Sequence, residues 1–284
     1  VAEIAAIPQI VSKDQLPKAM SATNVVEWSG ELTGPAIGGF LVGLAKTTLI
    51  GAMLAYLVQG LMQFMSVLSL TAIRQKLEDP QTGSQSSLLA DIRGGVSWLV
   101  SNSAVRSLAL MAMALNFLFG PVTIAIIVLA KNDYAATPEA IGLLFSMAGV
   151  VGLGSAIVAP WFHRKFKVGH ILVSSVSIWA IGMLVMPASG SFYVLAIGWA
   201  IVTAVGGIYD VVATSYRLAL IPDAMQGRVN SVFRFIGFGI RPLTLAIGGF
   251  MIAAIGARET LWVLALGMLA LAIATALGSL RSVE

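Results

Sequence analysis

Long apolar runs alternate with short polar connections along almost the whole chain. A membrane-spanning helix needs about twenty mainly apolar residues to cross the hydrocarbon core of a bilayer. Eight stretches meet this requirement, and they cover residues 20–44, 49–73, 105–130, 140–161, 171–188, 192–215, 229–255 and 260–280. The pattern therefore predicts an all-α membrane protein with eight transmembrane helices.

The longest connection separates the first two predicted spans from the other six. Its first half, residues 78–87, is polar and rich in turn formers, which predicts a flexible linker. In its second half, apolar residues recur near helical spacing, at Ile92, Val96, Leu99 and Val100. This half is predicted to form an amphipathic helix on the membrane surface.

Basic residues in the connections predict the orientation of the spans. Connections on one side of the membrane, beginning with the one before the first span, carry thirteen Lys and Arg residues when Arg106 and Arg234 at the adjoining span ends are included. The opposite side carries only Lys46, Lys131 and Arg258. Positive charge accumulates on the cytoplasmic side, so the first set, including the long connection, is predicted to be cytoplasmic.

Composition supports this class and excludes several others. Hydrophobic residues make up 58% of the 284 residues and charged residues 11%, with a mean hydropathy of +0.91. A soluble domain of this size could not bury so much apolar surface. The basic residues form no continuous patch of the kind that binds nucleic acid.

The sequence also lacks the residues that several kinds of chemistry require. It has no cysteine, and its two histidines, His163 and His170, form no metal-binding cluster. It contains neither a nucleotide-binding loop nor a nucleophile paired with a base. We therefore expect no metal, no cofactor and no enzymatic activity.

An internal repeat predicts how the spans are organised. Residues 36–40, Ala-Ile-Gly-Gly-Phe, return unchanged as residues 246–250. Six spans separate the two copies, so both enter the membrane from the same side, as parallel repeats do. If each half has six helices, residues 1–73 end the N-terminal bundle with two complete spans, residues 74–104 form the cytoplasmic linker, and residues 105–284 form the C-terminal bundle. We then expect helices one to four to precede this chain.

Small residues in the first predicted span form a regular pattern. Gly30, Gly34 and Gly38 recur every four residues and therefore leave one helix face without side chains. Pro35 removes one helical hydrogen bond at the same place and bends the helix. A smooth, kinked face for close helix packing is predicted here.

Residues 30–39, Gly-Glu-Leu-Thr-Gly-Pro-Ala-Ile-Gly-Gly, resemble the antiporter motif on the fifth helix of drug-proton antiporters in the major facilitator superfamily. That motif usually opens with a further glycine, where this chain has Ser21. Residues 222–229, Pro-Asp-Ala-Met-Gln-Gly-Arg-Val, resemble the entry to the eleventh helix in the branch that includes enterobactin and macrolide efflux proteins. In the first of these two segments, Gly39 is the last residue of the antiporter-like motif and is expected to take part in its packing.

The resemblance implies a major facilitator fold, of which this chain supplies helices five to twelve. It further implies a monomeric exporter in the bacterial inner membrane that moves an amphipathic, drug-like small molecule by alternating access against protons. Export of a siderophore or a lysophospholipid, or a fragment that transports nothing, remain open alternatives.

Acidic side chains inside the first span need an explanation, because a charge at a helix centre costs about 2.5 to 3.5 kcal/mol on insertion scales. Glu27 and Glu31 are one helical turn apart and share a face. Two carboxylates so close in hydrocarbon should not both be ionised, so one of them is a candidate proton carrier. Alternatively, Glu31 is neutralised at a helix interface, and Glu27 is solvated near the cytoplasm.

Three further polar residues are candidates for a role in transport. Two of them lie on helices that line the cavity in this superfamily, and the third is related to Glu31 by the internal repeat. Asp210 either takes part in transport or pairs with Arg217 or with an arginine of a connection. Asn116 precedes a Gly-Pro kink and is followed by two aromatic residues, Phe117 and Phe119, which suits an apolar pocket, although such an amide also bonds neighbouring helices. Arg241 occupies the repeat position of Glu31, where it either binds an anionic substrate or forms a structural ion pair with one of the helices expected to precede this chain.

The predicted eighth helix offers a partner for the glycine face. Gly142, Gly149 and Ala156 follow at heptad spacing and form a second face of small residues. We expect the two faces to seal one side of the cavity while the halves rock. Gly34→Leu should then abolish export and leave membrane insertion intact.

Overall fold

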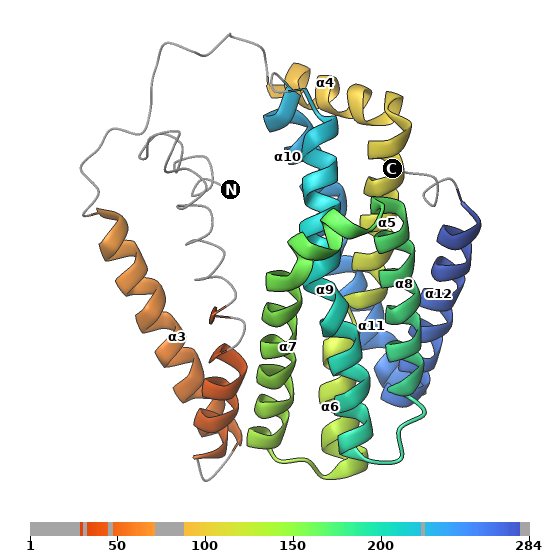
Figure 1. Ribbon diagram of the computed structural model, residues 1–284. Helices are drawn as coiled ribbons and strands as arrows, with labels where there is room; N and C mark the ends of the chain where they lie inside the picture. Colours follow the sequence, from red (N-terminus) through yellow and green to blue (C-terminus); the bar gives the residue numbers. More distant parts are fainter. Residues whose placement is uncertain (1–28, 31–32, 45–47, 72–87, 223–224, 279–284) are drawn as a thin grey trace. The chain divides into compact units, whose positions relative to one another are not determined.

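The computed structural model describes residues 29–30, 33–44, 48–71, 88–222 and 225–278. These residues form α-helices joined by short turns, and the described ranges contain no strand (Figure 1). In chain order, the helices after the short apolar helix Thr33–Gly43 are α3 (Thr48–Thr71), α4 (Leu88–Ser101), α5 (Ser103–Phe119), α6 (Val122–Tyr134), α7 (Pro138–Lys165), α8 (Val168–Val185), α9 (Phe192–Leu220), α10 (Gln226–Gly239), α11 (Arg241–Ile255) and α12 (Ala257–Leu277).

Seven helical segments of the described chain are long and apolar enough to cross a membrane. They cover Leu49–Ser69, Ser103–Tyr134, Pro138–Lys165, Val168–Val185, Phe192–Leu220, Gln226–Ile255 and Ala257–Leu277. The all-α membrane fold is thereby confirmed, together with the last seven predicted spans. Most of the first predicted span, residues 20–44, lies outside the described residues, apart from the helix Thr33–Gly43.

Two of the seven spans are interrupted near their middle. Ser103–Tyr134 divides at Gly120 and Pro121 into α5 and α6, as the predicted Gly-Pro kink requires. Gln226–Ile255 divides at Ile240, two residues before Pro242 in the first turn of α11. Proline has no N–H to donate to the preceding turn but fits the first turn of a new helix, so each span continues as two helices.

The described chain consists of two compact units. One comprises residues 1–85 and 137–149, and the other comprises residues 86–136 and 150–284. In the second unit, α8 packs against both α9 and α12. A Cβ on Gly198 would lie 3.1 Å from the carbonyl oxygen of Gly182, so the backbones of α8 and α9 approach closely. Trp179 Nε1 adds a 2.8 Å hydrogen bond to the carbonyl of Val202 across this contact.

Helix α4 forms where the amphipathic pattern predicted a helix, and it belongs to the second unit. Its Leu99 is buried with residues of α5 and α10, including Val105, Val229 and Val232. By contrast, Ile92, Val96 and Val100 are exposed. This apolar stripe suits a helix lying on a membrane surface, and that position stays a prediction.

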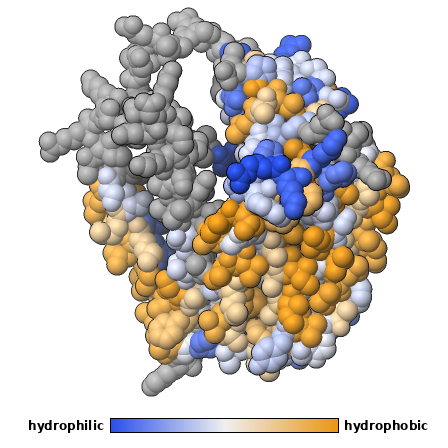
Figure 2. Space-filling model, in the orientation of Figure 1, coloured by the Kyte–Doolittle hydropathy of each residue, from blue (hydrophilic) through white to orange (hydrophobic). Residues whose placement is uncertain are grey.

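Large apolar side chains cover the outside of the spans, as a hydrocarbon solvent requires. Tyr193, Phe235, Phe250 and Leu277 are each at least 75% exposed. Figure 2 shows hydrophobic residues over much of the membrane-spanning part of the second unit, with hydrophilic residues gathered toward the end where α4 lies.

Candidate substrate and coupling site

The two interrupted spans meet at their interruptions. A Cβ on Gly120 would lie 3.0 Å from Cβ of Thr244, and one on Gly248 would lie 3.2 Å from Cα of Pro121. Ile240 follows Gln226 by 14 residues in a 30-residue span, so the break lies at mid-depth. Transporters place binding sites at such mid-depth interruptions, where the free backbone groups face a cavity or other protein groups.

Asn116 lies one helical turn before the break in its span. Its Nδ2 donates a 2.9 Å hydrogen bond to the carbonyl of Ala112 on the same helix. A Cβ on Gly237 of α10 would lie 3.8 Å from this Nδ2, so the half-buried amide stands beside α10. The structure thus brings Asn116 to the meeting point of the two spans, and its part in substrate binding stays a prediction.

Arg241 begins α11 and is exposed at mid-depth. Its guanidinium carbon lies 4.9 Å from the centre of the Phe238 ring, and that of Arg234 lies 5.9 Å from the same centre. Phe238 is 48% exposed. We call these three residues, Arg234, Phe238 and Arg241, the arginine stripe. Within the described ranges, neither arginine forms an ion pair with a carboxylate.

Asp210 is exposed on α9, directly after the buried Tyr209. Tyr209 packs on Trp179 with ring centres 4.7 Å apart, which fixes this turn of the helix. Arg217, the expected partner of Asp210, has its guanidinium carbon 3.9 Å from the centre of the Phe233 ring. The transport role of Asp210 stays a prediction.

In the first unit, the helix Thr33–Gly43, which we call the motif helix, approaches α7 closely at Gly39, and not at the glycines that recur every four residues. A Cβ on Gly39 would lie 2.6 Å from the carbonyl oxygen of Pro138 and 3.0 Å from Cα of Gly142 on α7. Conversely, a Cβ on Gly142 would lie 2.6 Å from the carbonyl oxygen of Pro35. The predicted face consists of Gly30, Gly34 and Gly38. A Cβ added at any of these three glycines would meet no heavy atom of the described chain within 4 Å.

Helix α7 therefore contacts the motif helix through the small residue Gly142. The other residues of the predicted heptad face, Gly149 and Ala156, are not among these close contacts. The packing role of the predicted glycine face stays a prediction. Ser21, Glu27 and Glu31 lie outside the described residues.

An apolar groove of about 490 Å³ opens beside the same break. Its lining includes Phe117 and Leu118 of α5, Ile240, and Gly267 and Leu271 of α12. The lining of the groove contains none of the three residues of the arginine stripe. We conclude that the groove and the arginine stripe are separate surfaces.

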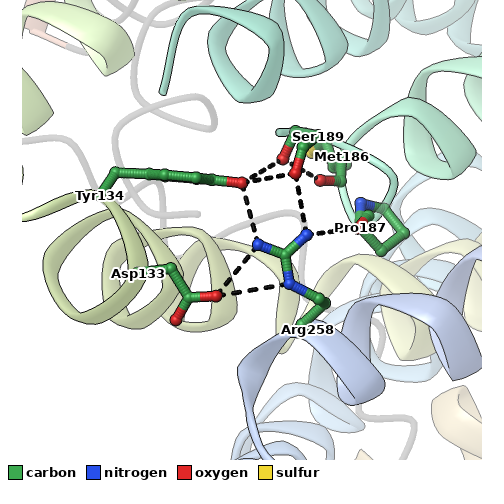
Figure 3. A network of polar contacts seen from close by, with 6 residues as sticks. All are labelled: Asp133, Tyr134, Met186, Pro187, Ser189 and Arg258. Carbon is green, nitrogen blue, oxygen red and sulfur yellow. Dashed lines mark hydrogen bonds and ion pairs between the residues drawn. The ribbon is translucent and has the colours of Figure 1, made fainter. Parts of the chain in front are cut away.

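A polar network that the sequence analysis missed joins three connections at the opposite end from α4 (Figure 3). Arg258 Nη2 lies 3.0 Å from Asp133 Oδ2 and donates a 3.0 Å hydrogen bond to Tyr134 Oη. Its Nη1 donates to the carbonyl oxygens of Pro187 and Ser189, at 2.7 and 2.9 Å. The network thus ties the end of α6, the α8–α9 turn and the start of α12 together.

Tyr134 completes the network by bonding Ser189 directly. Its hydroxyl donates to the Ser189 carbonyl at 2.7 Å and lies 2.8 Å from Ser189 Oγ. We call Asp133, Tyr134, Ser189 and Arg258 the polar clasp. One signal could have found it, because Arg258 is one of only three basic residues on the predicted outer side.

Loss of the clasp arginine should destabilise the second unit. Arg258→Gln removes an ion pair and two bonds to backbone carbonyls, which we expect to cost about 2 kcal/mol, because the pair is only partly buried. Thermal unfolding in detergent, followed by tryptophan fluorescence, measures the change. Lys131→Gln removes an exposed base near the same end and should have no effect. An equal shift in both variants would contradict the prediction.

Comparison with known proteins identifies the family. The model of the transmembrane secretion effector family, MFS_3, matches residues 2–284, which is nearly the whole chain. An MFS-type transporter from Sinorhizobium fredii, y4rN, is 26% identical over 252 residues, covering 87% of this chain and 60% of that protein. The multidrug efflux pump Tap of Mycolicibacterium fortuitum is 25% identical over 269 residues, covering 91% of this chain and 62% of the pump.

Solved structures agree on the fold. A bacterial homologue of the iron transporter ferroportin in its inward-facing state superposes with a TM-score of 0.65 at 13% identity, covering 95% of this chain and 65% of that one. The outward-facing state of a bacterial ferroportin homologue gives a TM-score of 0.58 at 18% identity, with the same two coverages. At such identity these likenesses concern the fold alone.

The chain spans about three fifths of the length of the curated relatives it matches. Its seven described spans and its bacterial relatives make it a multi-pass protein of the bacterial plasma membrane. Together, the family match over nearly the full chain and the helical fold show that it belongs to the transmembrane secretion effector family of the major facilitator superfamily.

Proposed function

We propose that the protein is a secondary active exporter that moves an amphipathic small molecule across the plasma membrane by alternating access. The observation that carries this proposal is the meeting of two interrupted spans at mid-depth, beside Asn116 and exposed arginines. Charged groups inside a span usually face a water-filled path and not lipid. A substrate path along this side of the second unit explains why those side chains are there.

Protons are the coupling ion in this proposal. Glu27 and Glu31 are one turn apart in an apolar stretch of the sequence, which favours keeping one of them protonated. Asp210 on α9 is the third candidate. The sequence shows no nucleotide-binding loop that would support direct coupling to ATP. Family membership and the similarity to the efflux pump Tap support outward movement of a drug-like molecule.

Export should appear as resistance that depends on the proton gradient. The protein encoded by the natural gene is expressed in a bacterium lacking its own efflux pumps, and growth is scored on macrolides, cationic and anionic dyes and siderophore-type compounds. We expect resistance to at least one of these compounds, and we expect an uncoupler to abolish it. Resistance that survives the uncoupler would contradict proton coupling, and no resistance with the protein in the membrane would contradict drug export.

The candidate coupling residues can be tested within the same assay. Glu31→Gln and Asp210→Asn remove a charge with little change in shape, and loss of proton binding should reduce uncoupler-sensitive resistance by about tenfold or more. Glu259→Gln, an exposed carboxylate in the first turn of α12, is the matched control and should retain full resistance. Full activity of both test variants would leave the carboxylates with a structural role.

A further inference from the structure

The arginine stripe lies where a bilayer offers no counterion. Arg241 follows Gln226 by 15 residues and Arg234 follows it by 8, so they lie about 22 and 12 Å into a 30-residue span at 1.5 Å per residue. Lipid phosphates stay at the membrane surface, about 15 Å from the bilayer centre. A resident lipid therefore does not reach Arg241, and no carboxylate of the described residues forms an ion pair with it.

The two arginines lie on one side of the helix. Arg234 and Phe238 are one turn apart on α10, and Arg241, which begins α11 after the break, places its guanidinium against the same Phe238 ring. All three side chains are exposed, and neither guanidinium forms an ion pair within the part of the chain that the structure describes. This face carries two positive charges with an aromatic ring between them.

Phe238 organises this face without consuming its hydrogen-bonding capacity. Both guanidinium carbons lie within 6 Å of the ring centre, the range of a cation–π contact. A contact with a ring leaves N–H donors of the guanidinium available for a carboxylate or phosphate, which it binds in a bidentate manner. The half-exposed ring itself offers an apolar surface next to the charges.

We propose that the arginine stripe binds the anionic group of the transported molecule, so that the substrate is an amphiphile carrying a carboxylate or a phosphate. The guanidinium groups of Arg241 and Arg234 hold the anion, and Phe238 contacts the adjoining apolar part. This inference rests on the proposed export function for its physiological meaning, but binding to the stripe can be measured without transport.

Binding measurements with three small ligands test separately whether the site requires an anionic group and whether it requires an apolar chain. The protein encoded by the natural gene is purified into nanodiscs and titrated by calorimetry with octyl phosphate, octyltrimethylammonium and inorganic phosphate, with the heats of empty nanodiscs subtracted. We expect octyl phosphate to bind at least about tenfold more tightly than either of the others, because it alone supplies both an anion and an apolar chain. Preference for the cation, or equal binding of inorganic phosphate, would overturn the proposal.

Variants place the binding on the stripe. Arg241→Gln should weaken octyl phosphate binding by about tenfold or more, the usual effect of losing a charged hydrogen bond, and Arg241→Lys should recover part of it. Arg93→Gln, which removes an exposed arginine of α4, should bind as the wild type does. Unchanged binding in Arg241→Gln would overturn the assignment, and its tryptophan-detected unfolding curve shows whether that protein is folded.

A second arm separates the anion site from a structural role of Arg241 and from export itself. The double variant Glu31→Gln/Arg241→Gln makes this separation. If it regains the octyl phosphate binding that Arg241→Gln alone has lost, Arg241 neutralises Glu31 and the anion site is overturned. Uptake of radiolabelled octyl phosphate by inside-out vesicles then tests transport. Stripe-dependent binding without energised uptake would uphold the anion site and count against the export function.

Discussion

Gly207→Leu should remove most of the folded protein from the membrane, and Gly207→Ala should lower its unfolding temperature by several degrees. A Cβ at this position of α9 would lie 2.6 Å from the backbone nitrogen of Ala156 and 2.7 Å from the carbonyl oxygen of Gly152, both on α7. Backbone atoms in the middle of a helix cannot rotate away as a side chain can. The two helices would have to separate.

The contact at Gly207 also includes a polar link that separation would break. The N–H of Gly207 donates to Ser155 Oγ at 3.1 Å, and the same hydroxyl donates to the carbonyl of Gly152 at 2.7 Å. Overpacking of a tight contact costs about 1 to 3 kcal/mol, and leaving these groups unpaired adds a cost of similar size. In hydrocarbon no water can replace the lost bonds.

Gly206 provides the matched control for this prediction. It is the preceding residue on the same helix, yet a Cβ there would meet no described heavy atom within 4 Å. We therefore expect Gly206→Ala to unfold at or slightly above the wild-type temperature, because alanine favours a helix more than glycine does. Membrane yield and tryptophan-detected unfolding in detergent measure both variants. Equal losses at the two glycines would contradict an effect specific to the α7–α9 contact.

Gly39→Leu and Gly142→Leu should abolish export while leaving the protein in the membrane. Each Cβ would fall about 2.6 Å from a backbone carbonyl oxygen, that of Pro138 for Gly39 and that of Pro35 for Gly142. The larger side chain would force the motif helix away from α7. We expect uncoupler-sensitive resistance to fall to background, because a gap at this contact would let the transported molecule or protons leak.

Gly38→Leu tests which glycines of the motif matter. A Cβ on Gly38 or on Gly34 would meet no described heavy atom within 4 Å, so the structure predicts that leucine is tolerated better at these positions than at Gly39. The glycine spacing alone predicted Gly34→Leu as a damaging change. Loss of export in Gly38→Leu together with full export in Gly39→Leu, at equal membrane levels, would contradict the order predicted from the structure.

Sequence patterns located the interruptions of the spans but not what meets there. The Gly120-Pro121 kink could be predicted, because proline breaks a helical hydrogen bond wherever it stands. That Thr244 packs against Gly120 depends on how two helices cross, and no local pattern encodes a crossing. The same holds for the groove that Ile240 shares with α12.

The candidate site shows the same division. Arg241 and Asn116 were found from the sequence, because a polar side chain in an apolar run is conspicuous and costly. The stacking of Arg241 and Arg234 on Phe238 became visible only when the helical faces were fixed. The contact of the Arg217 guanidinium with the Phe233 ring also became visible only in the structure.

The sequence by itself determined the all-α membrane class and the positions of seven spans, because lipid requires long apolar segments whose backbone groups are satisfied within helices. The tertiary structure alone decided that Gly39 and not Gly38 meets α7, and that Arg258 reaches Asp133, 125 residues away, to form the polar clasp. Such contacts join segments distant in the chain. Their geometry depends on how whole helices pack, which the local period of a sequence does not specify.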